Sequence, residues 1–394
     1  MSEIMSINDL DLQGKKTLLR VDFNVPLDRG EVRDDTRIRA ALPTIRELLS
    51  RGARIAVASH LGRPKGKTQD DLKMDPVAKR LSELLGKEVL KLDYSAGDEV
   101  AAAVEKMQNG EILLLENLRF EAGEEKNDPQ FARLLAAPFE LFVNDAFGTA
   151  HRAHASTAGV AEYIPAVAGL LMKKEIEELS RCLDDPGRPL TAVLGGAKVS
   201  DKINVIKRFL SLADNLLIGG GMANTFLAAR GYGLGDSFYE KDLLNQAAEL
   251  LEASKDSSCR IHLPPDLVVT RELEKGSAWE VMTPEQVDGS WKAVDIGPET
   301  ARQYGDIVAG SAMLVWNGPL GVFEIPPFDK GTKLVARAAA ESSAYSVVGG
   351  GDLVAALEAL GLAGDISFIS TGGGATLEFW EGKELPGIAV LKKK

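Results

Sequence analysis

Glycine follows four strand-like segments in the second half of the chain, and each glycine run precedes a helical pattern. The four junctions are Gly195-Gly196-Ala197-Lys198, Gly219-Gly220-Gly221, Gly349-Gly350-Gly351-Asp352 and Gly372-Gly373-Gly374. Glycine lets a ligand approach the backbone, and the N-terminus of the next helix offers free N–H groups to an anion. One such junction alone is more often a tight turn, but four together predict a site for a polyphosphate nucleotide.

Charged residues stand beside two of these junctions. Lys198 and Lys202 are four residues apart at the expected start of a helix, a spacing that places both ammonium groups on one face. We interpret them as phosphate ligands, although solvated lysines are the commoner case. Asp352 suits Mg²⁺ bound to the nucleotide, because magnesium is often held by one carboxylate plus phosphates. A helix N-cap aspartate fits the same position.

Arginine is concentrated in the first half of the chain. From Arg20 to Arg63 there are nine arginines, no lysines and six acidic residues, in a protein whose net charge is −12. The arginine fork suits carboxylate and phosphate groups and stays charged when desolvated. His60 closes a strand-like run, and Arg119 and Arg152 come after two others. Each arginine singly reads as a surface salt bridge, but the set predicts a pocket for a small, multiply anionic molecule.

Asp22 and Asn24 lie at the end of the first strand-like run, where they suit hydroxyl or carboxylate groups of that ligand. Neither has a serine or cysteine partner arranged for nucleophilic attack, so no covalent intermediate is expected. A nucleotide on one domain and a small anion on another indicate phosphoryl transfer, which needs positioning, charge neutralisation and dry surroundings. Two domains that close on each other supply all three.

Short apolar runs alternate with amphipathic segments along the whole chain, a pattern typical of parallel sheets covered by helices on both faces. The expected strands are 17–23, 53–60, 111–117, 141–147, 190–196, 215–221, 313–318, 345–351 and 366–374. The segment 316–324 reads as a shaped loop at a strand end. A helical stretch, 171–183, ends at an Asp-Asp-Pro-Gly-Arg-Pro cluster that stops a helix. We therefore expect an α/β protein of two domains with a junction around 170–187.

Composition limits the remaining classes. The chain has 394 residues, of which 45% are hydrophobic and 26% charged, which argues against a disordered, fibrous or membrane protein. The acidic balance disfavours nucleic-acid binding by bulk electrostatics. The N-terminus lacks the basic and apolar regions of a signal peptide, so the cytoplasm is the expected setting. No glycine run is G-x-G-x-x-G followed by an acid at dinucleotide spacing, which disfavours a nicotinamide site.

Nine motifs closely resemble those of the phosphoglycerate kinase family and occur in that family's order. They are VDFNVPL (21–27), SHLGRP (59–64), ENLRF (116–120), AFGTAHRAHAST (146–157), LGGAKVSDK (194–202), GGGMANTF (219–226), WNGPLGVFE (316–324), GGGD (349–352) and STGGGATLEF (370–379). The resemblance implies two doubly wound parallel-sheet, Rossmann-like domains joined by a hinge with a connecting helix. Residues 1–170 would form the phosphoglycerate-binding domain, with the tail 384–394 packed on it. Residues 171–187 would form the connecting helix and hinge, and 188–383 the nucleotide-binding domain.

The same resemblance implies reversible phosphoryl transfer from 1,3-bisphosphoglycerate to MgADP, giving 3-phosphoglycerate and MgATP, in glycolysis and gluconeogenesis. Transfer would be direct, across a cleft that closes between the domains. Mg²⁺ would accompany the nucleotide, the partners would be small molecules rather than nucleic acid or membrane, and the chain would be a monomer. That the donor is an acyl phosphate comes from the family alone.

Residue roles also come from the resemblance. Seven residues would bind the phosphoglycerate: Asp22, Asn24, Arg37, His60, Arg63, Arg119 and Arg152. Arg37 would lie near the moving phosphoryl group, with Lys198 and the Gly372-Gly373-Gly374 helix N-terminus stabilising that group. Lys202, Gly350, Gly351 and Asp352 would hold nucleotide phosphates and Mg²⁺. Asn317 and Glu324 would lie along the nucleotide, with Glu324 at the ribose and Gly219, Gly220 and Gly221 near the base.

Two positions depart from the family pattern. Leu353 stands where a threonine or serine hydroxyl usually helps to hold nucleotide phosphate, so we expect weaker nucleotide binding through the backbone N–H alone. Phe368 stands where histidine is common, and the sequence gives no account of its effect. Two alternatives remain, a nicotinamide dehydrogenase on a doubly wound sheet and a family member that binds nucleotide without catalysis. The glycine pattern argues against the first, and intact Arg37, Lys198 and Asp352 argue against the second.

Overall fold

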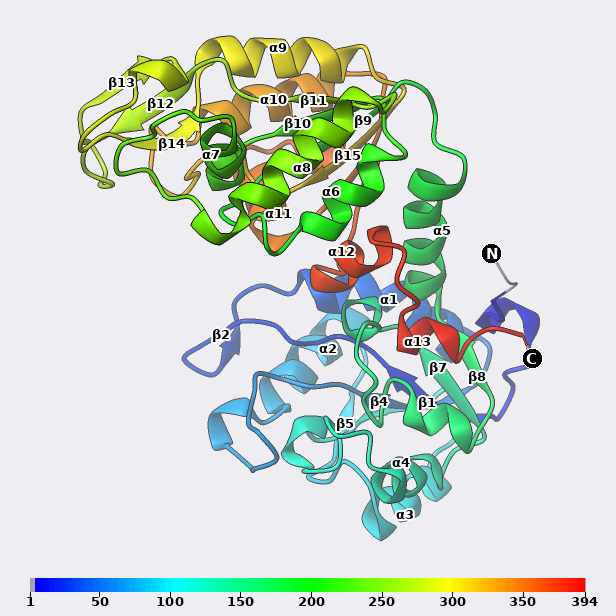
Figure 1. The fold of residues 1–394 in the computed structure, drawn as a ribbon. Coiled ribbons are helices and arrows are strands. Elements are labelled where there is room, and N and C mark those ends of the chain that lie inside the picture. Colours follow the sequence, from blue (N-terminus) through cyan, green and yellow to red (C-terminus); the bar gives the residue numbers. More distant parts are fainter. Residues whose placement is uncertain (1–3, 394) are drawn as a thin grey trace. The chain divides into compact units, whose positions relative to one another are not determined.

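The computed structural model describes residues 4–393, and the chain divides into two compact units (Figure 1). Unit 1 combines Met1–Glu177 with Glu384–Lys394, and unit 2 is Glu178–Lys383. The division falls inside α5 (Leu170–Asp184), a helix that occupies most of the stretch expected to connect the domains. No helix within residues 4–393 combines the length and the apolar character needed to cross a membrane.

Unit 1 is built on a six-stranded parallel sheet in the order β5-β6-β4-β1-β7-β8. Its strands are β1 (Lys16–Arg20), β4 (Arg54–Ala58), β5 (Leu90–Lys91), β6 (Ile112–Leu114), β7 (Leu141–Asn144) and β8 (Ala166–Ala168). A small hairpin joins β2 (Leu27–Asp28) to β3 (Glu31–Val32). The helices are α1 (Thr36–Ser50), α2 (Asp75–Leu85), α3 (Asp98–Lys106), α4 (Pro129–Ala136) and α13 (Pro386–Ala389).

Both faces of this sheet are buried, which explains the continuous apolar runs in the sequence. Successive side chains of a strand point to opposite faces. Leu19 therefore packs in one hydrophobic cluster with Ile38 of α1. Its neighbour Leu18 packs in another with Val100 of α3 and Leu135 of α4. Helices on both faces of a parallel sheet confirm the predicted doubly wound α/β class for this unit.

Unit 2 has its own six-stranded parallel sheet in the order β11-β10-β9-β15-β16-β17. Its strands are β9 (Leu190–Leu194), β10 (Asn215–Ile218), β11 (Arg260–His262), β15 (Met313–Asn317), β16 (Tyr345–Gly349) and β17 (Phe368–Ile369). The helices are α6 (Ile203–Leu210), α7 (Gly220–Ala229), α8 (Leu244–Lys255), α9 (Pro298–Ala309), α10 (Lys330–Glu341), α11 (Gly351–Ala359) and α12 (Gly374–Trp380). Figure 1 shows α9 and α10 on the face of the sheet opposite α6 and α8. The strand order reverses between β9 and β15, the position where doubly wound sheets bind ligands.

The expected strands all contain a real strand, but most of them end earlier than expected. The predicted 17–23 ends at Arg20 in β1, and the predicted 366–374 shrinks to Phe368–Ile369 in β17. The residues beyond each strand leave the ladder and form loops at the carboxyl edge of the sheet. A three-stranded antiparallel sheet, β13-β12-β14, was not predicted; it contains β12 (Leu267–Thr270), β13 (Trp279–Met282) and β14 (Lys292–Ile296).

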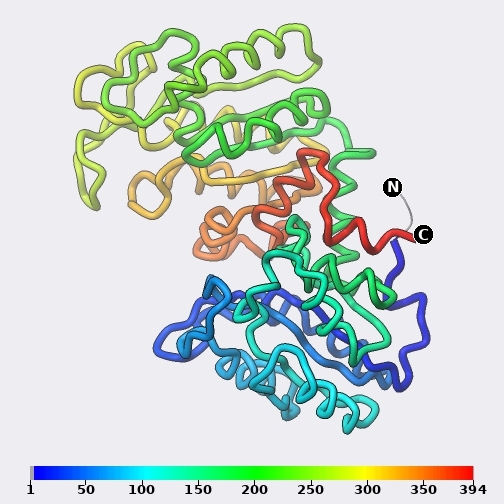
Figure 2. The backbone as a smooth tube through the Cα atoms, turned by 60° about the horizontal axis from the view of Figure 1, so that its bottom comes forward, coloured from blue at the N-terminus to red at the C-terminus, as the bar shows by residue number. Residues whose placement is uncertain are grey.

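The C-terminal segment packs on unit 1. Gly387 donates its backbone N–H to the carbonyl oxygen of Ala150 at 2.8 Å and accepts from Nδ2 of Asn144 at 3.1 Å. The N–H of Met5 donates to the carbonyl oxygen of Leu391. Figure 2 shows the red end of the chain beside the blue beginning. Unit 1 is therefore completed by residues from both ends of the sequence.

Candidate functional site

A cavity of about 440 Å³ lies at the carboxyl edge of the sheet in unit 2. Loops that follow β9, β15, β16 and β17 form its wall, so it lies at the switch point of the sheet. Its lining residues are Gly195, Gly196, Ala197, Lys198, Asp201, Lys202, Asn317, Gly318, Pro319, Gly350, Gly351, Asp352, Leu353, Gly373, Gly374 and Leu377. Three of the four glycine junctions seen in the sequence meet here.

The glycines serve this cavity in two ways. A Cβ on Gly195 would lie 2.1 Å from the carbonyl oxygen of Pro319, so glycine lets the β9 and β15 loops pack closely. Gly373 has φ +54°, in the left-handed region that favours glycine, and a Cβ there would meet nothing within 4 Å. The first position is explained by packing, whereas the second keeps the wall open to a ligand. Gly372 is not on the wall; its N–H donates to Oγ of Ser370.

Lys202 is a buried cation in the centre of this arrangement. Its side-chain Nζ donates to the carbonyl oxygen of Gly195 at 2.5 Å and to that of Asn317 at 3.2 Å. Gly195 follows β9 and Asn317 ends β15, so the two acceptors lie on either side of the switch point. Burial lowers its pKa to about 8, against the opposing effect of Asp201 and Asp352. No carboxylate among residues 4–393 forms an ion pair with this buried ammonium group, which makes the cavity suited to an anion.

Lys198 lies on the same wall but for a different reason from the one expected. Helix α6 begins at Ile203, so residues 198–202 lie in the loop and turn before it, and the helical i,i+4 argument for Lys198 and Lys202 was wrong. Lys198 is exposed, while Lys202 is buried. The two ammonium groups reach one cavity because the loop after β9 folds over it, and one of them is free to follow a ligand.

The cavity also suits a magnesium ion that arrives with a phosphate ligand. Asp352 lies in the first turn of α11 and is exposed on the cavity wall, which Asp201 shares. No cluster of three or more His, Cys, Asp or Glu that could hold a metal exists within residues 4–393. One carboxylate supplemented by phosphate oxygens matches the way magnesium is commonly bound. The donor set therefore fits Mg²⁺ only together with the nucleotide.

A second cavity, of about 410 Å³, adjoins the first and shares Gly196, Ala197, Pro319 and Asp352 with it. Its wall includes Gly220 and Gly221 as well as Glu324, as the resemblance implies. It also includes Asn224, Phe238, Leu273 and Val322, which sequence reasoning missed. Apolar side chains beside a carboxylate suit the flat base and the ribose hydroxyls of a nucleoside. Gly219 is not on this wall, because it packs against Leu320.

Asn317 and Leu353 line the first cavity with their side chains engaged elsewhere. Nδ2 of Asn317 donates to the carbonyl oxygen of Gly349 at 2.8 Å and so ties β15 to β16. Leu353 has no exposed surface and packs in the hydrophobic cluster that includes Trp316 and Val348. Leucine at this position is therefore a core residue that offers only its backbone to the cavity.

In unit 1, three of the expected ligands form one hydrogen-bonded group. Nη1 of Arg37 lies 3.1 Å from both carboxylate oxygens of Asp22 and 3.1 Å from the carbonyl oxygen of Asn24. Oδ1 of Asn24 accepts from the N–H of Gly62 at 2.9 Å. The loop after β1 is thus joined to the first turn of α1 and to the loop after β4, which carries His60 and Arg63.

His60 and Arg119 lie together behind this group. Nη1 of Arg119 donates to the carbonyl oxygen of Gly62 at 2.7 Å, and Nε lies 3.3 Å from Oε1 of Glu125. Within residues 4–393, Nη2 of Arg119 is buried with no hydrogen-bond partner. Burial, with the charges of Arg20, Arg119, Arg37 and Arg152, keeps the pKa of His60 well below 6.5. A buried donor without an acceptor beside a neutral imidazole is suited to an anionic ligand.

Asn117 is a residue that the sequence analysis did not single out. Its Oδ1 accepts from the N–H groups of Leu61 and Arg119 at 3.2 and 3.1 Å. Its Nδ2 donates to the carbonyl oxygens of Leu61 and Leu72 at 2.8 and 3.0 Å. Every hydrogen bond of this buried amide goes to a loop that carries His60, Arg63 or Arg119. Its place in the ENLRF motif was the only available signal.

Arg63 and Arg152 are less constrained. Arg63 is exposed and directly follows Gly62, and Arg152 is partly exposed with Nε 3.1 Å from Nε2 of His151. The charge of Arg152 contributes to the low pKa of His60. The expected phosphoglycerate ligands of unit 1 therefore gather around the ends of β1, β4, β6 and β7.

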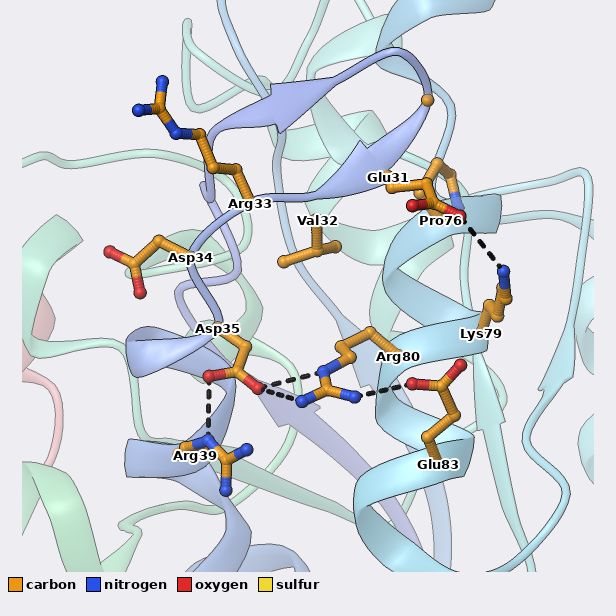
Figure 3. Close-up of a pocket in the computed structure, with 11 residues that line it drawn as sticks. Glu31, Val32, Arg33, Asp34, Asp35, Arg39, Pro76, Lys79, Arg80 and Glu83 are labelled. Atoms are coloured by element: carbon orange, nitrogen blue, oxygen red, sulfur yellow. Dashed lines mark hydrogen bonds and ion pairs between the residues drawn. The ribbon is translucent and has the colours of Figure 1, made fainter.

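A third cavity, of about 500 Å³, lies between the β2–β3 hairpin and α2 (Figure 3). Consecutive ion pairs line its wall. The carboxylate of Asp35 pairs with Arg39 at 2.8 Å and with Arg80 at 2.6 Å, and Arg80 also pairs with Glu83 at 2.6 Å. Because these cations already have partners, the cavity offers little to an anion. Its network instead ties the start of α1, which carries Arg37, to α2.

A nucleotide-sized cavity at a switch point, with an arginine-rich group at the carboxyl edge of a second parallel sheet, defines an α/β enzyme of the kinase class. The chain belongs to the phosphoglycerate kinase family, whose model, described as "Phosphoglycerate kinase", matches residues 7–383. It is 55% identical over 390 residues to the phosphoglycerate kinase of Moorella thermoacetica, with 99% of both chains covered.

Solved structures agree with this assignment. The phosphoglycerate kinase of Coxiella burnetii is 42% identical, with a TM-score of 0.91 and 99% of both chains covered. That of Pyrococcus horikoshii is 35% identical, with a TM-score of 0.85 and 98% of both chains covered. These comparisons confirm the family and the two-sheet α/β fold expected from the motifs.

Proposed function

We propose that this chain catalyses reversible phosphoryl transfer between the acyl phosphate of 1,3-bisphosphoglycerate and MgADP. A terminal phosphate oxygen of ADP attacks the phosphorus, the bond to the C1 carboxyl oxygen breaks, and 3-phosphoglycerate leaves as a carboxylate. The observation that carries this proposal is Lys202, a buried ammonium group at the switch point of a glycine-lined cavity, which pairs with no carboxylate in the described part of the chain. We place the reaction in glycolysis and gluconeogenesis, and we expect a monomer.

Residues of unit 2 hold the nucleotide in this proposal. Lys202, with the backbone of Gly350, Gly351 and Leu353, binds its phosphates, and Glu324 lies at the ribose. Asp352 would hold Mg²⁺ together with phosphate oxygens of the nucleotide, and a bound ion would supply positive charge against the phosphates. Lys198 and the Gly373-Gly374 turn face the phosphoryl group that moves. Phosphoryl transfer depends mainly on such positioning and charge stabilisation.

Residues of unit 1 hold the phosphoglycerate. Asp22 and Asn24 bind its polar groups, while His60, Arg63, Arg119 and Arg152 surround its 3-phosphate. Arg37 lies near the transferred phosphoryl group, where its fork contacts negatively charged oxygens. The two substrates bind to different units, so transfer requires the bound ligands to be brought into line and water to be excluded.

The test is acyl-phosphate formation from 3-phosphoglycerate and MgATP, trapped with hydroxylamine. We expect product only when both substrates and Mg²⁺ are present, and a loss of about 100-fold or more in Lys198→Ala. Omission of each component is the control for non-enzymatic signal. No product from a folded protein that binds MgADP would overturn the proposal and favour a nucleotide-binding member without catalysis.

A further inference from the structure

Arg20 is a buried arginine to which none of the roles above is assigned. It ends β1 at the switch point of the unit 1 sheet and is 1% exposed. Its Nε donates to Oγ of Ser156 at 2.9 Å, and Nη1 donates to the carbonyl oxygen of Val21. Its Nη2 lies 3.2 Å from Nδ1 of His60. Its guanidinium group is thus directed at an imidazole that the proposed function places beside the 3-phosphate.

The contact between Arg20 and His60 has only one possible direction. Arginine carries donors alone and does not deprotonate in proteins, so Nδ1 of His60 must be the acceptor. A ring that accepts at Nδ1 and is neutral carries its proton on Nε2. No hydrogen bond of Nε2 is found among residues 4–393, so this N–H remains for a ligand.

A buried carboxylate holds Arg20 from the other side. Glu124 has no exposed surface, and its Oε1 accepts from Oγ of Ser156 at 2.5 Å while Oε2 accepts from the N–H of Ser156 at 3.0 Å. Nδ1 of His154 lies 3.9 Å from the same carboxylate. Ser156 therefore links the two buried charges, each of which needs the other to be tolerated inside the unit.

We propose that Arg20 is a positioning residue that fixes His60 as the Nε2–H tautomer, so that His60 meets the substrate phosphate as a neutral hydrogen-bond donor. The successive hydrogen bonds from Ser156 to Glu124, from Arg20 to Ser156 and from Arg20 to His60 set the orientation of the imidazole ring. The arginines around the ring supply the positive charge. The charged groups that face His60 are Arg20 from β1, Arg37 from α1, Arg119 from the loop after β6 and Arg152 from the loop after β7. The assignment of a phosphate as the ligand rests on the proposed function, whereas the tautomer does not.

Nitrogen-15 NMR of the imidazoles tests the tautomer without substrate. The chain has four histidines, and His60→Gln assigns the signal. We expect the Nε2–H form of His60, without titration, between about pH 5.5 and 8. In Arg20→Met/Glu124→Gln, which removes the buried charge pair together, we expect a tautomer mixture that titrates nearer 6.5. Arg51→Met, an arginine that donates to the carbonyl oxygens of Ile7 and Leu10, is the control and leaves the signal unchanged.

Kinetics supply the second readout. In the double variant, protonation of His60 adds attraction for phosphate. The ratio of KM for 3-phosphoglycerate in the variant to KM in wild type therefore falls several-fold as pH drops below about 6.5. The effect on kcat is smaller. Titration of the substrate phosphate is common to both proteins and cancels in this ratio. Arg20→Lys keeps the charge without the fork and is expected to give an intermediate signal. An Nδ1–H or imidazolium signal in wild type, or an unchanged signal in the double variant, overturns the inference. Inactive wild type with the expected signal overturns the proposed function alone.

Discussion

At the scale of single residues, the site of unit 2 depends on a lysine whose charge is marginal. Lys202 is 8% exposed, and within residues 4–393 its side-chain Nζ donates to the carbonyl oxygens of Gly195 and Asn317 and to no carboxylate. Burial disfavours the charged form, so the ammonium group loses its proton at a pH where an exposed lysine keeps it. In the proposed function, a nucleotide phosphate supplies the counter-ion. Proton binding and nucleotide binding at this lysine are therefore coupled.

We expect the affinity for MgADP to fall as pH rises through about 8, because Lys202 becomes neutral in the free protein. Loss of a charge-assisted contact corresponds to a Kd about tenfold higher at pH 9 than at pH 7. Calorimetric titration at several pH values measures this. Lys202→Met should bind weakly with little pH dependence, and Lys198→Met should keep the wild-type slope. A slope that persists in Lys202→Met contradicts the assignment.

Arg37→Ala should lower kcat by about 100-fold or more, because a charged donor near the moving group is lost. The Kd for MgADP should stay within about twofold, since Arg37 belongs to unit 1 and the nucleotide cavity to unit 2. Arg39→Ala is a matched control on the same helix, because Arg39 pairs with Asp35 and is exposed. Steady-state kinetics and equilibrium MgADP binding separate the two effects. An equal loss of MgADP affinity would contradict the role given to Arg37.

Leu353→Thr tests the departure from the family pattern. Threonine removes buried apolar surface, so the free energy of unfolding should fall by about 1–3 kcal/mol. Its hydroxyl should lower the Kd for MgADP about threefold to tenfold. Leu353→Val makes a similar loss of packing without a hydroxyl and should show only the first effect. Urea unfolding and calorimetry measure the two quantities, and equal affinities in the two variants would exclude a phosphate contact.

At the scale of elements, buried carboxylates hold the beginnings of two helices. Oδ1 of Asp145, just after β7, accepts from the N–H of Met172 in the first turn of α5 at 3.0 Å. Oδ2 of Asp295, in β14, accepts from the N–H of Gly331 at the start of α10 at 2.8 Å. Each carboxylate acts as a cap supplied from a distant strand. Burial raises the pKa of Asp145 to about 7 and that of Asp295 to about 8.

These raised pKa values predict a loss of stability with increasing pH. The folded protein binds protons at Asp295 that the unfolded chain, with a pKa near 3.8, releases. The stabilising contribution of Asp295 to the free energy of unfolding is therefore complete below about pH 4 and is lost as pH rises through about 8. Asp295→Asn should reduce the difference in unfolding free energy between pH 5 and pH 8, whereas exposed Asp306→Asn should not. Urea unfolding at the two pH values measures it, and an unchanged difference in Asp295→Asn counts against a protonated carboxyl group.

The sequence predicts most of the parallel sheets because their strands are buried on both faces and read as continuous apolar runs. It misses β13, whose residues Trp279, Glu280 and Val281 are exposed. It places Lys198 and Lys202 in the same cavity for a wrong reason, since periodicity does not show that α6 begins only at Ile203. Arg20 was missed because its partner Ser156 is 136 positions away, and long-range contacts leave no local signal. Motif resemblance supplied the residue roles that spacing could not.

At the scale of the whole molecule, the tryptophans distinguish the two units. All four tryptophans lie within Glu178–Lys383, so tryptophan fluorescence reports unit 2 alone. Unit 1 instead depends on the tail for part of its core, because Leu385, Ile388 and Leu391 are buried there. Circular dichroism reports the helices and strands of both units, so an unfolding transition that circular dichroism detects but tryptophan fluorescence does not detect belongs to unit 1.

Removal of residues 384–394 should destabilise unit 1 by several kcal/mol, from the loss of three buried apolar side chains. We expect circular dichroism to show a transition of unit 1 at lower urea, while the fluorescence transition of unit 2 shifts much less. A chain shortened by only its last two residues keeps Leu391 and is the control. Equal shifts with both probes would show that the tail does not act on unit 1 separately.

The return of the tail also has a consequence for synthesis on the ribosome. Unit 2 is continuous in the sequence and can be completed while translation is still under way. Unit 1 starts first, but Leu385, Ile388 and Leu391 are translated after the whole of unit 2, so the core of unit 1 stays incomplete until unit 2 has been synthesised. Domains usually fold in the order in which they emerge. Here the unit whose synthesis begins first is completed last, and the apolar surface that receives Leu385, Ile388 and Leu391 stays uncovered until these residues emerge.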